Sequence, residues 1–134
     1  MSEENDPIFI IMSALAKAVA GNPEGTKFSK EFGKKVGFRI PGECIILFDT
    51  ANLTVKKYAE KEAPTADLEL IGNRKVLTDI IVLEKSPMKY MMTRKFKTKG
   101  GFDELMKYGK IADFVKDSPI TAEAAQKARK LVGH

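Results

Sequence analysis

The amino-acid sequence contains little of what most catalytic and metal-binding sites require. Its 134 residues include one cysteine, Cys44, one histidine, His134, and no tryptophan. A single cysteine excludes a disulfide within the chain. Zinc sites built from Cys and His, Ser-His-Asp triads and Cys-His nucleophile pairs all need residues that this sequence lacks. Only carboxylate or lysine chemistry remains, and we expect a protein that is not an enzyme and uses no metal or cofactor.

The sequence also lacks a long apolar run. The run from Ile8 to Ala16 is interrupted by Lys17, and it is shorter than the roughly 20 residues that a membrane-spanning helix needs. We find no signal peptide, and the final tripeptide of Val132, Gly133 and His134 is not the S-K-L peroxisomal signal. A content of 43% hydrophobic and 31% charged residues is typical of a globular protein. We expect a single domain over residues 1–134, located in the cytoplasm.

The spacing of apolar residues alternates between helical and strand-like patterns along the chain. Four strands in succession predict a meander-like antiparallel arrangement, to which a later strand is added. The fold class we expect is therefore α+β, with a five-stranded, mainly antiparallel sheet covered by helices on one face. The expected helices cover residues 7–21, 28–36, 73–83, 87–92, 102–115 and 122–132, and the expected strands cover residues 38–40, 43–49, 53–58, 66–72 and 94–98.

Methionine is concentrated in one part of the chain. Four of the six methionines, Met88, Met91, Met92 and Met106, fall within a short stretch. Met fills gaps in ordinary cores, and it also lines surfaces that adapt to ligands of different shape. The helices expected over 73–92 are apolar on more than the one face that a sheet needs to cover. This breadth favours a cavity or a partner over simple core packing.

A basic stripe follows the same region, although the whole chain carries a net charge of only +5. The stripe comprises Lys85, Lys89, Arg94, Lys95, Lys97 and Lys99, with no acidic residue between its ends. Its aromatic pattern does not match that of RNA-binding strands, so nucleic acid is not the expected partner. Two readings stay open: lysines that protect a solvated edge strand from aggregation, and attraction to anionic lipid headgroups.

Three other residues, Asp67, Glu69 and Cys44, carry side chains that can take part in acid–base or nucleophilic chemistry. Asp67 and Glu69 are two positions apart on an expected strand and share a face, which is an arrangement that an acid and a base can use. Without a neighbouring histidine or nucleophile, we expect both to be charges facing solvent. Cys44 alternates with Ile46 in an apolar strand, so we expect a buried, unreactive thiol.

Several short strings, in their order, resemble the sterol carrier protein 2 (SCP2) family, also called the non-specific lipid-transfer or SCP2 sterol-binding domain. The resemblance covers roughly residues 9–115. It rests on Gly37-Phe38-Arg39-Ile40 before the hairpin, Ala66-Asp67-Leu68-Glu69 at the fourth strand, Ser86-Pro87 before a helix, and Lys95-Phe96-Lys97 followed by Gly100. These strings look like the family's Ala-Asp strand, its proline-started helix, and its final strand and turn.

The resemblance implies a sheet and helices that enclose an apolar tunnel and bind a lipid without covalent chemistry. The ligand would be a sterol, fatty acid, fatty acyl-CoA or phospholipid, and the chain would bind it and transfer it. The alternative is an accessory or dimerisation module. Such a module would form a homodimer or would present lipid to an enzyme partner. A small-molecule enzyme is the third hypothesis. The expected lipid-binding wall comprises Leu77, Ile81, Met88, Met91, Met92, Phe96 and Met106. The expected headgroup or transient anionic-membrane contact comprises Lys89, Arg94, Lys95, Lys97 and Lys99.

Overall fold

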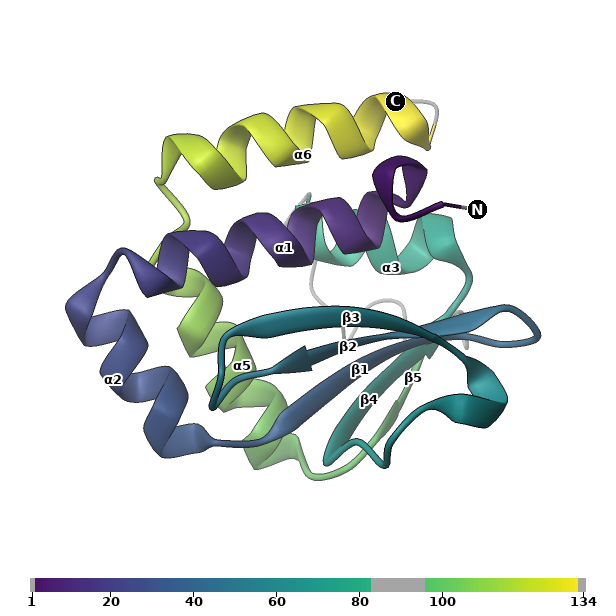
Figure 1. Ribbon diagram of the computed structural model, residues 1–134, viewed down its shortest axis with the longest axis horizontal. Coiled ribbons are helices and arrows are strands. Elements are labelled where there is room, and N and C mark those ends of the chain that lie inside the picture. Colours follow the sequence, from purple (N-terminus) through teal and green to yellow (C-terminus); the bar gives the residue numbers. More distant parts are fainter. Residues whose placement is uncertain (1, 83–95, 133–134) are drawn as a thin grey trace.

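The structure, a computed structural model, describes residues 2–82 and 96–132. Its helices and strands form tiers, with α1 and α3 over one face of a twisted sheet and α6 on the outer side of α1 (Figure 1). In chain order the elements are η1 (Glu3–Asn5), α1 (Pro7–Ala20), α2 (Pro23–Phe32), β1 (Lys35–Ile40), β2 (Cys44–Asp49), β3 (Thr54–Ala59), η2 (Glu60–Glu62), β4 (Leu68–Gly72), α3 (Arg74–Val82), β5 (Phe96–Lys99), α5 (Phe102–Asp113) and α6 (Pro119–Leu131). The expected α+β class with five strands is confirmed.

Caps and prolines set the starts of three helices. Asp6 accepts a hydrogen bond from the Ile8 amide at 3.1 Å, and Pro7 occupies the first turn of α1, as the sequence predicts. Asn22 caps α2 in the same way, with Pro23 in the first turn. Helix α6 begins at Pro119 behind the Ser118 cap, so the start expected at residue 122 is wrong. The Ser118-Pro119 pair is itself a cap and a first-turn proline.

The second helix is also shorter at its end than its apolar spacing suggests. Gly33 adopts a left-handed conformation with φ of 59°, which ends α2. Val36, which continues the helical spacing of Phe28 and Phe32, lies in β1 instead and pairs with Phe48. The expectation of helix up to residue 36 was therefore wrong, because a glycine stop overrides a continuing apolar stripe.

The sheet has the strand order β3-β2-β1-β4-β5. Three of its pairings are antiparallel, whereas β1 and β4 are parallel. The expected meander of four successive strands is therefore wrong, although the sheet remains mainly antiparallel. The chain leaves β3 at one edge, passes through η2 along the side of the sheet opposite α1, and enters β4 beside β1 (Figure 1). That crossing makes β1 a central strand.

The two faces of the sheet bury different kinds of residue. The face toward the helices carries the hydrophobic core, with Phe38, Ile46 and Leu70 aligned across three strands. The opposite face is approached by the connection over residues 60–67. Gly37 makes this approach possible, since a Cβ at that position would lie 3.3 Å from the Ala66 Cβ. The fold thus has a helix-covered face and a loop-covered face.

The loop-covered face includes an ion pair that sequence analysis placed in solvent. Glu69 is only 4% exposed, and its Oε1 lies 2.6 Å from Arg39 Nη2. Arg39 also pairs with Glu60 of η2 at 3.1 Å. The expectation that Glu69 faces solvent was wrong because it did not anticipate the neighbouring Arg39. Asp67 is exposed, as expected, and accepts a hydrogen bond from the Lys35 amide at 2.8 Å.

Candidate functional site

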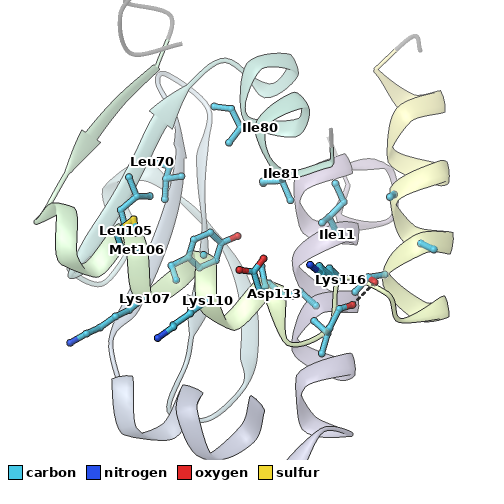
Figure 2. A pocket seen from close by; sticks show the side chains of 18 of the residues that line it. Ile11, Leu70, Ile80, Ile81, Leu105, Met106, Lys107, Lys110, Asp113 and Lys116 are labelled. Carbon is cyan, nitrogen blue, oxygen red and sulfur yellow. Dashed lines mark hydrogen bonds between the residues drawn. The ribbon is translucent and has the colours of Figure 1, made fainter. Parts of the chain in front are cut away.

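A cavity of about 1170 Å³ lies between the helices and the helix-covered face of the sheet. Figure 2 shows Leu70, Leu105 and Met106 on one side of it, with Ile80, Ile81 and Ile11 on the other. Helices α1, α3, α5 and α6 and strand β4 all contribute to the wall. The apolar side chains among its described lining residues are Ile11, Leu15, Leu70, Ile80, Ile81, Phe102, Leu105, Met106, Tyr108, Ala112, Val115, Ala122 and Ala125.

Helical spacing explains why these side chains meet in one place. Ile11 and Leu15 are four residues apart on α1, and Ala122 and Ala125 are three apart on α6. Residues at these separations lie on the same face of a helix. Helix α6 packs against α1 where Ala128 meets Ile11. One face of each helix thus contributes to the wall.

Part of the cavity wall is in contact with solvent. Phe102 is 66% exposed and Met106 is 58% exposed, although both line the cavity. They are four residues apart on α5 and thus lie on one face of the helix. Lys107 and Lys110 also line the cavity, and Figure 2 shows their side chains extending away from the apolar groups. This rim combines apolar and basic groups.

Nine of the described lining residues are polar or charged, and Tyr108 is the most deeply buried of them. Its ring packs edge-on against Phe38, with the centroids 5.8 Å apart. Its hydroxyl lies 3.5 Å from the Met12 sulfur. Burial raises the pKa of the Tyr108 phenol, so the group is a neutral donor at physiological pH. The Thr121 hydroxyl also reaches the wall, and it already donates to the carbonyl oxygens of Ser118 and Val115, at 2.8 Å and 3.0 Å.

The structure distributes the expected lipid-binding residues over two environments. Ile81 and Met106 line the cavity. Leu77 and Phe96 are buried in the core, and neither is among the described lining residues. Met88, Met91 and Met92 lie outside the described residues. Sequence analysis missed the contributions of α1 and α6, because a wall made by residues more than 100 positions apart leaves no local pattern.

The expected headgroup contact is described only at its C-terminal end. Lys97 and Lys99 are exposed on β5, an edge strand of the sheet. By register they share the loop-covered face with Glu69, whereas Phe96 points to the core. Lys99 lies 3.9 Å from Glu69. Lys89, Arg94 and Lys95 lie outside the described residues. The lysines that line the cavity are Lys107, Lys110 and Lys116, which sequence analysis did not single out.

A second, smaller pocket of about 400 Å³ lies at the start of α1 and is polar. Asp6 is fully buried beside it and pairs with Lys57 at 2.8 Å and with Arg74 at 3.2 Å. Arg74 reaches Glu43 at 2.7 Å and also lies 3.6 Å from the Cys44 sulfur. Burial raises the pKa of the Cys44 thiol, which favours the unreactive protonated form. The expected burial of Cys44 is confirmed.

The described residues include no cluster of three or more His, Cys, Asp or Glu side chains that could hold a metal ion. Over the same residues, no helix is long and apolar enough to cross a membrane.

A mixed sheet and covering helices around a large, mainly apolar cavity define an α+β domain with room for a hydrophobic molecule. A family model described as the SCP-2 sterol transfer family matches residues 15–113. The chain belongs to this family, which confirms the resemblance seen in the sequence. Domains of the family are in general non-catalytic and lipid-binding, and some form parts of enzymes. No curated protein sequence matched the chain.

Solved structures with the same fold include sterol carrier proteins from two organisms. The sterol carrier protein domain 2 of Helicoverpa armigera is 18% identical, with a TM-score of 0.63 and 94% of each chain covered. A UbiJ-SCP2 ubiquinone synthesis protein is 17% identical, with a TM-score of 0.60 over 81% of this chain and 90% of that one. The apo form of sterol carrier protein 2 from Yarrowia lipolytica is 14% identical, with a TM-score of 0.53 over 92% and 91%. At these identities the similarity concerns the fold.

Proposed function

We propose that this chain binds a hydrophobic ligand in the cavity between its helices and sheet, and transfers it. The ligand class comprises sterols, fatty acids, fatty acyl-CoAs and phospholipids. The observation that carries the proposal is a cavity of about 1170 Å³ with a mainly apolar lining. A cavity of this size is slightly larger than the range of about 300–1,000 Å³ for small-molecule sites. The family match supports the same conclusion.

The energetics of such binding are favourable and moderate. Burying each methylene contributes about 0.8 kcal/mol, so an acyl chain of roughly 15 methylenes gains about 12 kcal/mol. Loss of translational, rotational and chain freedom offsets at least about 4 kcal/mol of this gain. At this lower bound of the cost, the remainder corresponds to a dissociation constant of about 1 μM. This affinity suits a carrier, because it permits both loading and release.

Titration of the delipidated protein with a fluorescent fatty acid and a fluorescent sterol tests the proposal. Met106→Glu places a negative charge in the cavity wall, where it repels a carboxylate and is unfavourable beside an apolar ligand, and should weaken binding about tenfold. Ile120→Glu is the matched control, because Ile120 is 39% exposed, compared with 58% for Met106, and is not among the described lining residues. It should bind as the wild type does. No saturable binding by the wild type, or equal weakening by both variants, refutes the proposal.

We propose further that the chain performs no catalysis. The most enzyme-like groups outside the cavity wall are Asp67, Glu69 and Cys44, and the last two are buried in structural contacts. Replacing each of them in turn should leave ligand binding within about threefold, provided that the variant folds. A hydrolytic or transfer activity that disappears with one of these substitutions would overturn this assignment.

A second candidate function is presentation of a lipid to an enzyme, or dimerisation. It is favoured by the shared fold of an SCP2 domain from a ubiquinone synthesis protein. Native mass spectrometry of the gently purified protein separates the candidates. A co-purified lipid on a monomer supports binding and transfer. A stoichiometric protein partner, or a second copy of the chain, supports the accessory role.

We also propose that the basic stripe contacts an anionic membrane surface transiently. Lys97 and Lys99 are exposed and carry no apolar anchor between them. A lysine near an anionic surface contributes about 1 kcal/mol of attraction, which is enough for reversible docking when several act together. We include Lys89, Arg94 and Lys95 in this proposed contact because they lie in the same basic stretch of the sequence.

A further inference from the structure

Tyr108 contributes a phenol group to the cavity wall. The residue lies on α5, lines the cavity and is 8% exposed. Its ring is fixed by the edge-on contact with Phe38 of β1, with the rings inclined at 66°. The hydroxyl is therefore held at a defined position between α5 and α1.

The hydrogen-bonding capacity of this hydroxyl is not well used by the protein. Its partner is the Met12 sulfur at 3.5 Å, and a thioether is a weak acceptor. Buried tyrosine hydroxyls normally find a full hydrogen-bond partner. Burial is also what raises the pKa of the phenol, which keeps its proton in place as a donor. An oxygen acceptor supplied by a bound molecule would give this donor the partner that the chain does not provide.

The other polar groups in the described lining are less enclosed. Asp103, Lys107, Lys110, Asp113, Lys116 and Gln126 are exposed, whereas Thr121 and Arg129 are half-buried. The single Thr121 hydroxyl proton is already shared between two carbonyl oxygens, and Lys107 lies 3.2 Å from Asp103. A ligand oxygen deep in the cavity would thus meet the phenol, and one at the rim would meet exposed, mostly charged groups.

We infer that Tyr108 is a specificity-determining residue that donates a hydrogen bond to a neutral oxygen of the ligand. The inference rests on the proposed function and predicts a preference, within the proposed ligand class, for a lipid with a hydroxyl or carbonyl oxygen on an apolar skeleton. A carboxylate beside a phenol and a thioether would be a buried charge, which is costly unless it is paired. We expect fatty acids to bind with the carboxylate nearer the charged side chains of the wall and not to depend on Tyr108.

Competition against a fluorescent fatty acid on the delipidated full chain tests the inference. The competitors are hexadecanol, hexadecane and hexadecanoate, which share one chain length and differ in the terminal group. The Tyr108→Phe variant keeps the ring and removes the donor. We expect it to bind hexadecanol about five- to tenfold more weakly than the wild type, as the loss of one hydrogen bond predicts. Binding of hexadecane and hexadecanoate should not change.

Met12→Leu is the matched variant, because it removes the weak sulfur acceptor and keeps the phenol. It should retain the preference for hexadecanol over hexadecane, and this result also serves as the test if Tyr108→Phe does not fold. Equal weakening of all three competitors by Tyr108→Phe indicates a packing role and overturns the inference, as does an unchanged affinity for hexadecanol. Loss of the preference in Met12→Leu overturns it as well. Absence of binding by the wild type refutes the proposed function instead.

Discussion

Replacing Asp6 by asparagine tests the buried charge cluster at the start of α1. Asp6 is 0% exposed and pairs with Lys57 and with Arg74. Asparagine retains a side-chain oxygen that can accept the hydrogen bond from the Ile8 amide, so the helix cap survives. The substitution thus removes the negative charge and little else.

The magnitude follows from what the two cations lose. The side chains of Lys57 and Arg74 are only 15% and 16% exposed. Removing one partner from a buried ion pair costs about 3–5 kcal/mol, because it leaves a charge uncompensated. Arg74 keeps its bond to Glu43 at 2.7 Å, so we expect the lower end, about 3 kcal/mol of the free energy of unfolding. Glu43→Gln is the control, because Glu43 is 54% exposed and its loss should cost less than about 1 kcal/mol.

The pH dependence has a definite sign. Burial by itself raises the pKa of Asp6, but hydrogen bonds from Lys57 and Arg74, and the charges of both, outweigh it and hold the pKa below its ordinary value of 3.8. A carboxylate with a lowered pKa in the folded state stabilises the fold fully above the unfolded value, and this contribution is lost as the pH falls through the folded pKa. The stability difference between wild type and Asp6→Asn should be constant at neutral pH and shrink below pH 3.8.

Urea unfolding curves measured at neutral and acidic pH give the loss of unfolding free energy in Asp6→Asn and its dependence on pH. The reasoning fails if Asp6→Asn lies within about 0.5 kcal/mol of the wild type at neutral pH. It fails equally if Glu43→Gln costs as much as Asp6→Asn, or if the difference between Asp6→Asn and wild type grows as the pH falls.

Two further predictions concern a pair of glycines and the basic stripe. Gly100→Ala should cost about 2–4 kcal/mol, since φ at this position is +116° and the new Cβ would lie 2.7 Å from the Asp67 carbonyl oxygen. Gly109→Ala, with no atom within 4 Å of its Cβ, should instead stabilise α5 by about 0.8–1 kcal/mol in the same urea assay; a comparable loss in both would contradict this. Replacing Lys97 and Lys99 by glutamine should slow lipid transfer from anionic vesicles at low salt and leave transfer from zwitterionic vesicles unchanged, because exposed charges are screened over about 8 Å at physiological salt. An unchanged anionic rate would leave these lysines with edge-strand protection alone.

Local features of the fold were predictable from the sequence because their causes are local. The start of α1 at Pro7, the apolar run of β2 and the alternation in β3 involve neighbours in the chain. Asn73 is a further case, since its side chain accepts a hydrogen bond from the Val76 amide at 2.8 Å at the start of α3.

Features that depend on distant partners were not predictable in this way. The alternation of Leu68 and Leu70 indicates a strand, but it does not say that β4 pairs in parallel with β1. The burial of Glu69 depends on Arg39, which lies 30 residues away. The resemblance to the SCP2 family predicted how the helices and the sheet are arranged around an apolar interior, which the spacing of apolar residues alone does not indicate.

The same limit applies to the candidate site. Ile81 and Met106 were identified from breadth of apolar surface and from methionine content, and both line the cavity. Tyr108 carries no signal in its own neighbourhood, since its significance comes from Phe38 and Met12 on other elements. Leu77 shares the apolar pattern of Ile81 and is buried in the core, because helical spacing does not distinguish a wall from a core.

The packing of α6 on α1 has a consequence for how the chain acquires its structure during synthesis. Ile11 and Ala128 are in one buried cluster, yet the ribosome makes them 117 residues apart. At about 5–20 residues per second, α1 waits on the order of 10 s for the helix that covers its outer face. The cavity wall therefore closes only after the sheet has been made. A nascent chain in that interval exposes the side of α1 that carries Ile11.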